Sequence, residues 1–350
     1  MKTGIIGLPQ VGKTSLFSML TGAEVHLGRR EDRVGVATVP DPRLDRLAEL
    51  FRPHKLTHAN IELAEVGLLT PESLRDGSGI AALRTVDALA QVVRVFGREA
   101  GEPPVAEVSN LEFDMIVSDL GQVEKRMERV VKDLKRQRSP ALLEEAAILE
   151  RMKAHLEQEQ ALRTLPLTPE ERKTTRGFQF LSQKPILYVL NLGEEEAPQL
   201  ATAVERHGLA DALRSPNTGA TAICAKVEAE IASLPAGEAA EFLAGYGLQE
   251  TGVARLARAM YTLLGLVSFF TAGEDECRAW TIAQGTPAVE AAGAIHTDLS
   301  KHFIRAEVIG WEELLRLGSE SAARDAGKMR LEGKDYLVQD GEVMHIRHSG

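Results

Sequence analysis

Residues 7–14, GLPQVGKT, restrict the fold more than any other stretch of this chain. They match the phosphate-binding pattern G-x-x-x-x-G-K-[ST] at all four fixed positions. A short β-branched run at residues 2–6 precedes the loop, and SLFSML at residues 15–20 follows it with apolar residues at helical spacing. Strand, glycine-rich turn and helix in this order predict an α/β domain that binds phosphate at a helix N-terminus.

The residue types in the loop suit a bound nucleotide. Gly7 and Gly12 let the backbone wrap closely around phosphates, with several N–H groups pointing inward. Lys13 would reach the β- and γ-phosphates, and the hydroxyl of Thr14 would bind Mg²⁺. The flanking strand and helix disfavour the alternative, a glycine-rich turn without a ligand.

Four more apolar runs, at residues 61–66, 88–96, 185–192 and 220–224, are bounded by helical or turn-rich segments. This alternation predicts an α/β fold with a mainly parallel sheet. The length of 350 residues allows two or three domains, each with its own core.

From about residue 108 to 180 the pattern is helical, with apolar residues at intervals of three and four. Ser139-Pro140 breaks the pattern, so we expect two long antiparallel helices inserted in the α/β domain. The stretch Glu124–Arg138 carries seven basic and three acidic residues. It is either a solvated helical face or a surface that docks on RNA.

The C-terminal region has a different pattern. Short β-type runs, including DYLVQ at residues 335–339, surround a polar helix expected over residues 311–327. They predict a small mixed α+β domain. The predicted domains are a discontinuous nucleotide-binding domain at 1–107 and 181–266, a helical insertion at 108–180 and the α+β domain at 267–350.

Composition excludes several classes of protein. No window approaches 18 consecutive apolar residues and the start has no basic leader, so we expect a cytoplasmic protein without a membrane partner. The formal net charge of −10 argues against coating nucleic acid with the whole surface. Cys224 and Cys277 form no CxxC motif, which favours buried thiols over a disulfide or zinc site. We expect a monomer.

The segment that corresponds to the base-binding segment of a GTPase is Asn191-Leu192-Gly193-Glu194, at the end of a predicted strand. A GTPase would have NKxD there, with a carboxyl group that accepts the N1 and N2 hydrogens of guanine. NxxE weakens guanine selection and makes ATP plausible, while GTP stays open.

Several segments together resemble the YchF family, the Obg-like ATPases. They are GLPQVGKTSLF, VPDPRLDRLAELFRPHK, ILYVLNLGEEE, AICAKVEAEIASL and the tail from SFFTAG onward. The resemblance implies a P-loop domain interrupted by a helical arm, a C-terminal TGS domain of ubiquitin-like β-grasp fold, use of ATP, and association with ribosomes. It also implies the binding residues: Gln10, Val11, Gly12, Lys13, Thr14 and Ser15 for the phosphates, Asn191, Leu192 and Glu194 for the base, and Cys224, Ala225 and Lys226 for the loop that supports the base.

The chain departs from the family pattern in both switch regions. Arg29 lies near the position expected for the magnesium-binding threonine of the first switch, and Glu65 and Gly67 are the nearest counterparts of the aspartate and glycine of the second. Thr14 and Glu65 are therefore the candidate metal ligands, and Lys13 and Thr14 the candidate catalytic residues. Loss of switch groups would weaken the stabilisation of phosphoryl transfer.

Three hypotheses follow. The first is a slow Mg²⁺-dependent ATPase whose nucleotide state tunes docking to the ribosome or another RNA–protein partner. The second is an ATP-binding sensor or scaffold that no longer hydrolyses appreciably. In the third, the TGS domain and the basic helical arm bind the partner, and the phosphate loop is kept mainly for the stability of the fold.

Overall fold

The computed structural model of the chain describes residues 1–23, 33–66, 80–98, 103–137 and 139–349. These residues form two compact units. The first combines Met1–Val36 with Glu62–Leu263, and the second combines Ala37–Ile61 with Leu264–Gly350. Each unit has a hydrophobic cluster of its own.

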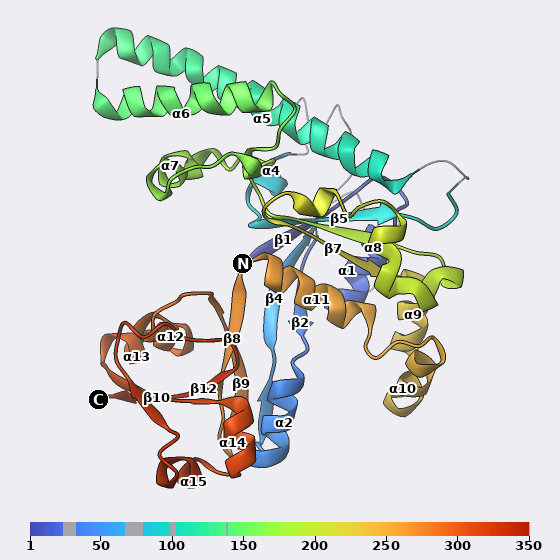
Figure 1. Ribbon diagram of the computed structural model, residues 1–350, viewed down its shortest axis with the longest axis vertical. Helices are drawn as coiled ribbons and strands as arrows, with labels where there is room; N and C mark the ends of the chain where they lie inside the picture. Colours follow the sequence, from blue (N-terminus) through green and yellow to red (C-terminus); the bar gives the residue numbers. More distant parts are fainter. Residues whose placement is uncertain (24–32, 67–79, 99–102, 138, 350) are drawn as a thin grey trace. The chain divides into compact units, whose positions relative to one another are not determined.

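Six strands of the described chain form one sheet in the order β2-β4-β1-β5-β6-β7 (Figure 1). The sheet belongs to the first unit except for residues 37–39 of β2 and 59–61 of β4. Their bounds are β1 (Lys2–Ile6), β2 (Arg33–Val39), β4 (Ala59–Glu65), β5 (Ala88–Arg94), β6 (Ile186–Asn191) and β7 (Thr218–Ile223). β1 pairs in parallel with β4 and β5, as do β5 with β6 and β6 with β7. The predicted α/β fold with a parallel sheet is confirmed.

Helices cover both faces of this sheet because parallel strands need crossover connections. α5 lies on one face, and α1 and α11 lie on the other (Figure 1). The helices are α1 (Lys13–Thr21), α4 (Ile80–Arg84), α5 (Pro104–Arg136), α6 (Pro140–Leu156), α7 (Pro169–Thr175), α8 (Ala203–Arg206), α9 (Ala225–Ser233), α10 (Ala236–Gly245) and α11 (Gly252–Leu263), with 3₁₀ helices at Leu162–Thr164, Arg176–Phe178, Glu194–Thr202 and Ala212–Arg214.

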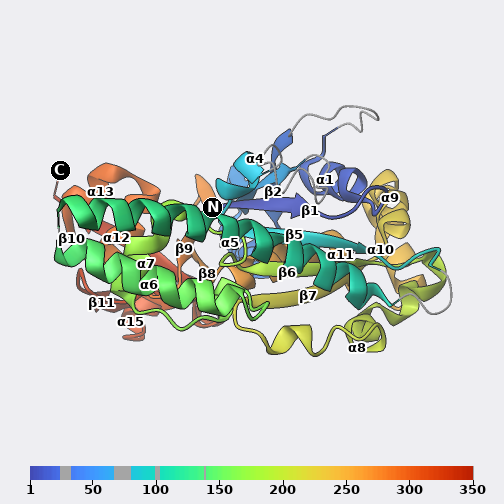
Figure 2. The same cartoon turned by 90° about the horizontal axis from the view of Figure 1, so that it is seen from above.

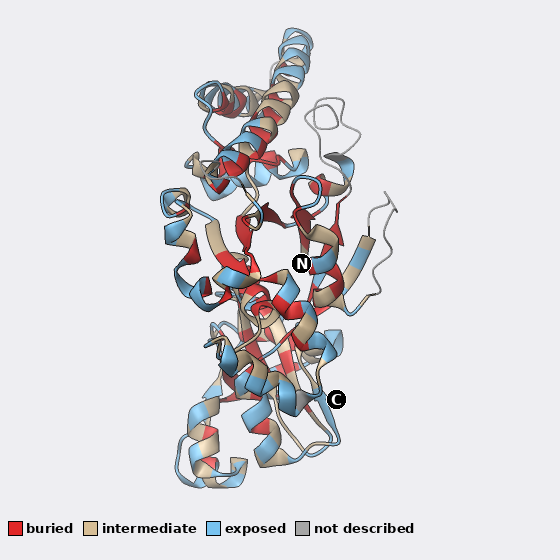
Figure 3. Cartoon of the chain, turned by 90° about the vertical axis from the view of Figure 1, so that its right-hand side faces the viewer, coloured by how far each residue is buried: buried red, intermediate tan, exposed pale blue. Residues whose placement is uncertain are grey.

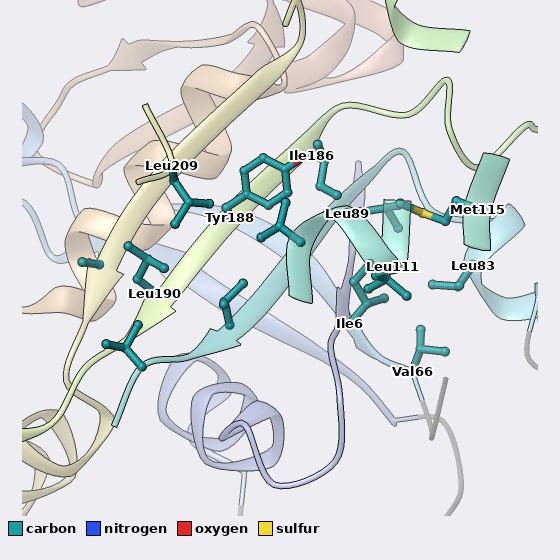
Figure 4. Close-up of a cluster of buried hydrophobic side chains, with 14 of the residues drawn as sticks. Ile6, Val66, Leu83, Leu89, Leu111, Met115, Ile186, Tyr188, Leu190 and Leu209 are labelled. Atoms are coloured by element: carbon teal, nitrogen blue, oxygen red, sulfur yellow. The ribbon is translucent and has the colours of Figure 1, made fainter. Parts of the chain in front are cut away.

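The core of the first unit lies between the sheet and α5. All residues of β6 are buried, as expected for a strand covered on both faces. Tyr188 and Leu190 of β6 pack in one cluster with Ile6 of β1, Leu89 of β5 and Met115 of α5 (Figure 4). Burial of each such apolar side chain contributes about 1.5–3 kcal/mol. Figure 3 shows buried residues along the strands, in agreement with the burial of nearly all of β5 and all of β6.

α5 and α6 are the predicted pair of long antiparallel helices, seen side by side in Figure 2. The break between them is where the sequence places it: the Ser139 side chain accepts a hydrogen bond from the N–H of Leu142 at 3.2 Å, and Pro140 is the first helical residue. Val123 of α5 and Leu149 of α6 are fully buried in the seam between the helices. This pair of helices is called the helical arm below.

A buried carboxylate ties the helical arm to the chain that leads into β6. Asp119 of α5 accepts hydrogen bonds from the N–H of Leu181 at 3.0 Å and from the N–H and hydroxyl of Ser182, both at 2.7 Å. Burial raises the pKa of Asp119, and the three hydrogen bonds act in the opposite direction. The base of the arm is therefore fixed to the sheet of the first unit.

The second unit is a mixed sheet in the order β11-β10-β12-β8-β9-β3. β8 pairs antiparallel with β9 and parallel with β12, and β12 pairs antiparallel with β10. The first and last long strands of the C-terminal region thus lie together at the centre, which is the predicted β-grasp arrangement. The elements are α2 (Pro42–Phe51), β3 (Lys55–Thr57), β8 (Leu266–Thr271), β9 (Glu276–Ala283), α12 (Ala288–Ile295), α13 (Thr297–Lys301), β10 (Phe303–Gly310), α14 (Trp311–Leu317), α15 (Glu320–Asp325), β11 (Arg330–Glu332) and β12 (Glu342–His348).

Two local predictions for the C-terminal region are wrong. The helix expected over residues 311–327 is divided into α14 and α15, because Gly318 ends the first with a φ of 79° and the side chain of Ser319 caps the second. The expected strand at 335–339 forms only an isolated bridge at Leu337. Gly and Ser side by side end and restart a helix more effectively than the apolar spacing extends it.

The stretch 37–61 is joined to the C-terminal region by contacts that the sequence pattern does not indicate. β3 pairs in parallel with β9. Asp41 caps α2 and also binds the guanidinium of Arg43, which forms a second ion pair with Asp340 at 2.6 Å. These contacts place the stretch in the second compact unit.

The predicted domain at 1–107 includes this stretch, so the compact units and the predicted domains divide the chain differently. The predicted boundaries after residues 107, 180 and 266 stay predictions. None of the helices in the described ranges is both long enough and apolar enough to cross a membrane.

Candidate nucleotide site

The phosphate loop connects β1 to α1, and close contacts require both of its fixed glycines. Gly7 has a φ of 145°, and a Cβ there would lie 2.5 Å from the carbonyl oxygen of Val92. Gly12 has a φ of 100°, and a Cβ there would lie 2.4 Å from Nδ2 of Asn191. A positive φ without space for a side chain explains glycine at both positions.

A cavity of about 850 Å³ lies beside this loop. It is large enough for a small molecule or cofactor and lies at the carboxyl ends of parallel strands, where α/β sheets bind ligands. Its walls come from the phosphate loop, the turn after β5, the end of β6 and the start of α9. The lining residues are Gln10, Gly12, Lys13, Thr14, Ser15, Phe96, Gly97, Asn191, Leu192, Gly193, Glu194, Glu195, Ala225, Lys226 and Ala229.

Four predicted site residues are not among those that line the cavity, and one of them, Glu65, meets the lining residue Thr14 through a hydrogen bond. Gly7 packs on the backbone of β5, and the side chains of Val11 and Cys224 are buried. Cys224 occupies the N-cap position of α9, and burial raises the pKa of its thiol, which is therefore neutral near neutral pH. Both cysteines are buried and free, as predicted.

Lys13 extends back over its own loop. Its Nζ donates to the carbonyl oxygens of Gly7 at 2.9 Å and Leu8 at 2.7 Å. Burial lowers the pKa of Lys13, while the carboxylates of Glu65 and Glu107 raise it. An ammonium group held by neutral carbonyls can exchange them for phosphate oxygens, with which its hydrogen bonds are stronger.

Thr14 and Glu65 meet beside the loop. The hydroxyl of Thr14 donates to Oε1 of Glu65 at 2.5 Å, and Glu65 ends β4 with its side chain nearly buried. Arg33 lies 3.5 Å from the other carboxylate oxygen, and its guanidinium is 4.9 Å from the centre of the Phe17 ring. A hydroxyl and a carboxylate are the oxygen ligands that Mg²⁺ takes in proteins, so this donor set fits the ion. The described residues contain no cluster of three or more His, Cys, Asp or Glu side chains that could hold a metal.

The other switch positions lie outside the described residues. Arg29 is the predicted counterpart of the switch threonine, and Gly67 that of the switch glycine. Among the candidate switch groups, the structure describes Glu65 alone.

Asn191 joins two loops of the site. Its Nδ2 donates to the carbonyl oxygen of Val11, and its Oδ1 accepts from the N–H of Ala225, both at 3.0 Å. The side chain is buried, and both ends of the amide are used by the backbone. Asn191 therefore sets the distance between the phosphate loop and the start of α9.

Glu194 is held in its charged form. It accepts hydrogen bonds from the ammonium of Lys226 and, at 3.2 Å, from the hydroxyl of Tyr246. These donors, Lys226 first, lower the pKa of Glu194. The same contact raises the pKa of Lys226. The result is a partly exposed carboxylate in the lining of the cavity.

Sequence reasoning missed several residues of this site. Phe96 and Gly97 follow β5, and their position at the carboxyl end of a strand beside the loop strand was a usable signal. Tyr246 follows α10, where no motif marks it, and it reaches Glu194 across 52 positions of sequence. Arg33 also carried no signal.

Comparison with known proteins agrees with the geometry. The family model YchF-GTPase_C, described as "Protein of unknown function (DUF933)", matches residues 266–349. The chain is 38% identical to "Ribosome-binding ATPase YchF" of Bacillus subtilis over 99% of both chains. It is also 38% identical to the protein of the same name from Escherichia coli O157:H7, over 99% of this chain and 98% of that one.

A solved structure shares the architecture along the whole chain. The YchF GTPase of Schizosaccharomyces pombe is matched with a TM-score of 0.80 and 27% identity, covering 99% of this chain and 97% of that one. The matches therefore include the phosphate loop, the helical arm and the C-terminal unit. With this identity over nearly its full length, the chain belongs to the YchF family.

Proposed function

We propose that the protein is a cytoplasmic P-loop ATPase that binds ATP with Mg²⁺ and whose nucleotide state regulates its binding to the ribosome or another RNA–protein partner. One observation carries this proposal: Lys13, the Thr14–Glu65 pair and Glu194 surround or adjoin a single cavity of about 850 Å³. The names of the bacterial relatives, which include ribosome binding and ATPase activity, support it.

The phosphate end of the cavity contains the groups for nucleotide binding and catalysis. Gln10 to Ser15 offer backbone N–H groups at the start of α1, and Lys13 offers an ammonium group to the β- and γ-phosphates. Thr14 and Glu65 would hold Mg²⁺, which supplies charge neutralisation at those phosphates. Lys13 and Thr14 would thus stabilise the charge that develops during phosphoryl transfer.

The base end favours adenine. The Glu194 carboxylate can accept a hydrogen bond from the exocyclic amino group of adenine. It can serve guanine less well because NxxE places the carboxyl group on a longer side chain than NKxD does. Leu192 and Phe96 supply apolar walls, and Asn191 and Ala225 fix the shape of this end. We therefore propose that ATP binds more tightly than GTP.

The helical arm and the β-grasp domain are the proposed docking parts. On α5, Lys125, Lys132 and Lys135 belong to the basic stretch 124–138, whose solvated face could contact RNA phosphates. Part of this charge is used within the arm, since Arg126 binds Glu145 at 2.7 Å. We further propose that the protein acts as a monomer.

One observation favours the second function, an ATP-binding sensor that hydrolyses little. Arg33 lies 3.5 Å from Glu65, so a guanidinium competes for the carboxylate that would face Mg²⁺. In this alternative, ATP binds and alters partner docking, but turnover stays near the background rate even with ribosomes present.

Isothermal titration calorimetry of ATP and GTP, with and without Mg²⁺, tests the proposal together with an assay of phosphate release. We expect Mg²⁺-dependent ATP binding tighter than GTP binding, and turnover that Lys13→Ala abolishes. Tight ATP binding without turnover would select the sensor function. Absence of ATP binding with and without Mg²⁺ would exclude the ATPase function and the sensor function. Ribosome binding that is unchanged in Lys13→Ala would favour a third function, in which the arm and the β-grasp domain bind the partner and the nucleotide has no influence.

A further inference from the structure

The open edge of the parallel sheet carries a second groove, with a volume of about 720 Å³, which shares no lining residue with the nucleotide cavity. Its floor is β7, the last strand in the sheet order (Figure 2). One wall is α11, and the other is formed by the 3₁₀ helix Glu194–Thr202 and α8. This groove is called the β7 groove below.

The backbone direction of β7 follows from its pairing with β6. The N–H of Ile186 donates to the carbonyl of Asn217 at 3.0 Å, and that of Leu192 donates to the carbonyl of Ile223 at 2.8 Å. In a parallel ladder, alternate residues turn their backbone groups toward the same neighbour. The residues of β7 whose backbone groups point away from β6 are therefore Thr218, Ala220 and Ala222.

Arg255 covers the buried end of this outer edge, where Ala222 is 3% exposed, whereas Ala220 is only partly buried. From α11 the Nη2 of Arg255 donates to the carbonyl oxygen of Ala222 at 3.1 Å. No other described residue forms a hydrogen bond with the outward N–H groups of Ala220 and Ala222 or with the carbonyl of Ala220. A row of unpaired backbone groups at a sheet edge is a template for an added strand.

The two walls contact opposite faces of β7. A Cβ on Gly219 would lie 3.7 Å from Leu263, so one face is turned toward α11. Ala220 and Ala222 pack in the cluster that contains Leu200, so the other face is turned toward the 3₁₀ helix. Successive side chains of an added strand would point alternately to these two walls.

The two walls differ in chemistry. The α11 wall presents Arg255 and Arg258, and the opposite wall presents Leu200 and Val204. Within the part of the chain that the structure describes, no acidic side chain lines the groove. The side chain of Arg258 is 53% exposed even though it pairs with Glu250. On a chain with a formal net charge of −10, the β7 groove is thus a local basic and apolar surface.

We infer that the β7 groove binds an extended segment of a partner protein in which acidic and apolar residues alternate. The segment lies along β7 as an added strand and accepts a hydrogen bond from the N–H of Ala220. Its acidic side chains face Arg255 and Arg258, and its apolar side chains face Leu200 and Val204. Backbone pairing supplies affinity, and the alternation supplies specificity.

The first test uses synthetic peptides and the full chain. A fluorescein-labelled peptide of alternating valine and glutamate is titrated by fluorescence anisotropy beside one of alternating valine and lysine, and beside a valine–glutamate peptide N-methylated on alternate residues. We expect micromolar binding of the first and at least about tenfold weaker binding of the others. Equal binding of the lysine or N-methylated peptide, or no binding of the acidic one, would overturn the inference.

The second test determines whether the peptide binds in the β7 groove. Ala220→Pro removes an outward N–H and keeps the pairing with β6, a position where a sheet edge accepts proline. Arg258→Gln removes one charge, and Arg214→Gln, with a side chain 85% exposed outside the groove, is its matched control. We expect at least about tenfold weaker peptide binding for the first, about threefold to tenfold for the second and no change for the control, with ATP affinity kept in all three.

A third variant and a spectroscopic measurement test the inference independently of the proline variant, in case that variant does not fold. Thr262→Trp fills the groove from the exposed surface of α11 and should abolish peptide binding. In hydrogen exchange followed by nuclear magnetic resonance, saturating acidic peptide should slow exchange at the amide of Ala220. Unchanged exchange at this amide, or parent-like peptide binding in Thr262→Trp, would refute strand addition at β7.

Discussion

Replacing Asn191 with alanine removes the side chain that joins the phosphate loop to the start of α9. The amide makes two hydrogen bonds of 3.0 Å, one to the carbonyl of Val11 and one from the N–H of Ala225. Each lost hydrogen bond costs about 1 kcal/mol net, and a buried backbone group left unpaired costs about 1–3 kcal/mol. We therefore expect the free energy of unfolding of the first unit to fall by about 2–4 kcal/mol, a large part of the 5–15 kcal/mol typical of a domain.

The same substitution is expected to weaken ATP binding by about 10–100-fold, because about 1.4 kcal/mol corresponds to a factor of ten and the bound nucleotide needs both loops in place. Urea unfolding followed by circular dichroism measures the stability, and calorimetry measures the ATP affinity. Asn110→Ala is the matched control, since Asn110 is exposed on α5.

Asn191→Asp separates the two contacts. It keeps an acceptor for the N–H of Ala225 but turns a carboxylate oxygen toward the carbonyl oxygen of Val11. Because the two oxygens repel each other, the free energy of unfolding of Asn191→Asp should be no higher than that of Asn191→Ala. The reasoning is refuted if Asn191→Ala stays within about 0.5 kcal/mol of the parent, the range of neutral surface changes, and binds ATP equally well.

Three further predictions concern the same site. Glu65→Gln removes the charge proposed to face Mg²⁺, so calorimetry should give equal ATP affinities with and without the ion; a parent-like effect of Mg²⁺ would contradict this. Gly12→Ala puts a Cβ into a 2.4 Å contact and should abolish ATP binding, whereas Gly22→Ala, with a φ of 67° and open space, should cost only about 1–2 kcal/mol of backbone strain and leave ATP binding intact. The hydrogen bond from Lys226 lowers the pKa of Glu194, so its stabilising contribution is present above the unfolded pKa and is lost as the pH falls through the lower folded pKa. In thermal unfolding from about pH 7 to about pH 3, the Tm of the parent should therefore fall more steeply than that of Glu194→Gln.

Local signals were sufficient for much of the architecture. The pattern GLPQVGKT, preceded by β-branched residues and followed by helical spacing, predicts β1, the loop and α1, which all form. Continuous apolar runs predict the buried strands β5 and β6. Ser139 and Pro140 locate the turn of the helical arm because a capping residue and a helix-starting proline act on their own neighbours.

Features that depend on distant contacts could not be predicted in this way. The Tyr246 hydroxyl meets Glu194 only because α9 and α10 pack in one cluster with the 3₁₀ helix that follows β6. Asn191 was predicted to hold the base, yet its amide is used by two backbone groups whose positions no tetrapeptide reveals. The ion pair between Arg43 and Asp340 joins residues 297 positions apart.

That last contact bears on how the chain acquires its structure during synthesis. α2 buries Leu44 and Leu47 in a unit whose remaining strands are encoded after residue 263. Domains generally fold from the N-terminus as they leave the ribosome. Here the stretch 37–61 leaves the ribosome early, but its contact partners β8, β9 and Asp340 are synthesised much later. A nascent chain arrested before residue 264 should therefore expose the apolar face of α2, and a fragment that begins at residue 264 should lack part of its own unit.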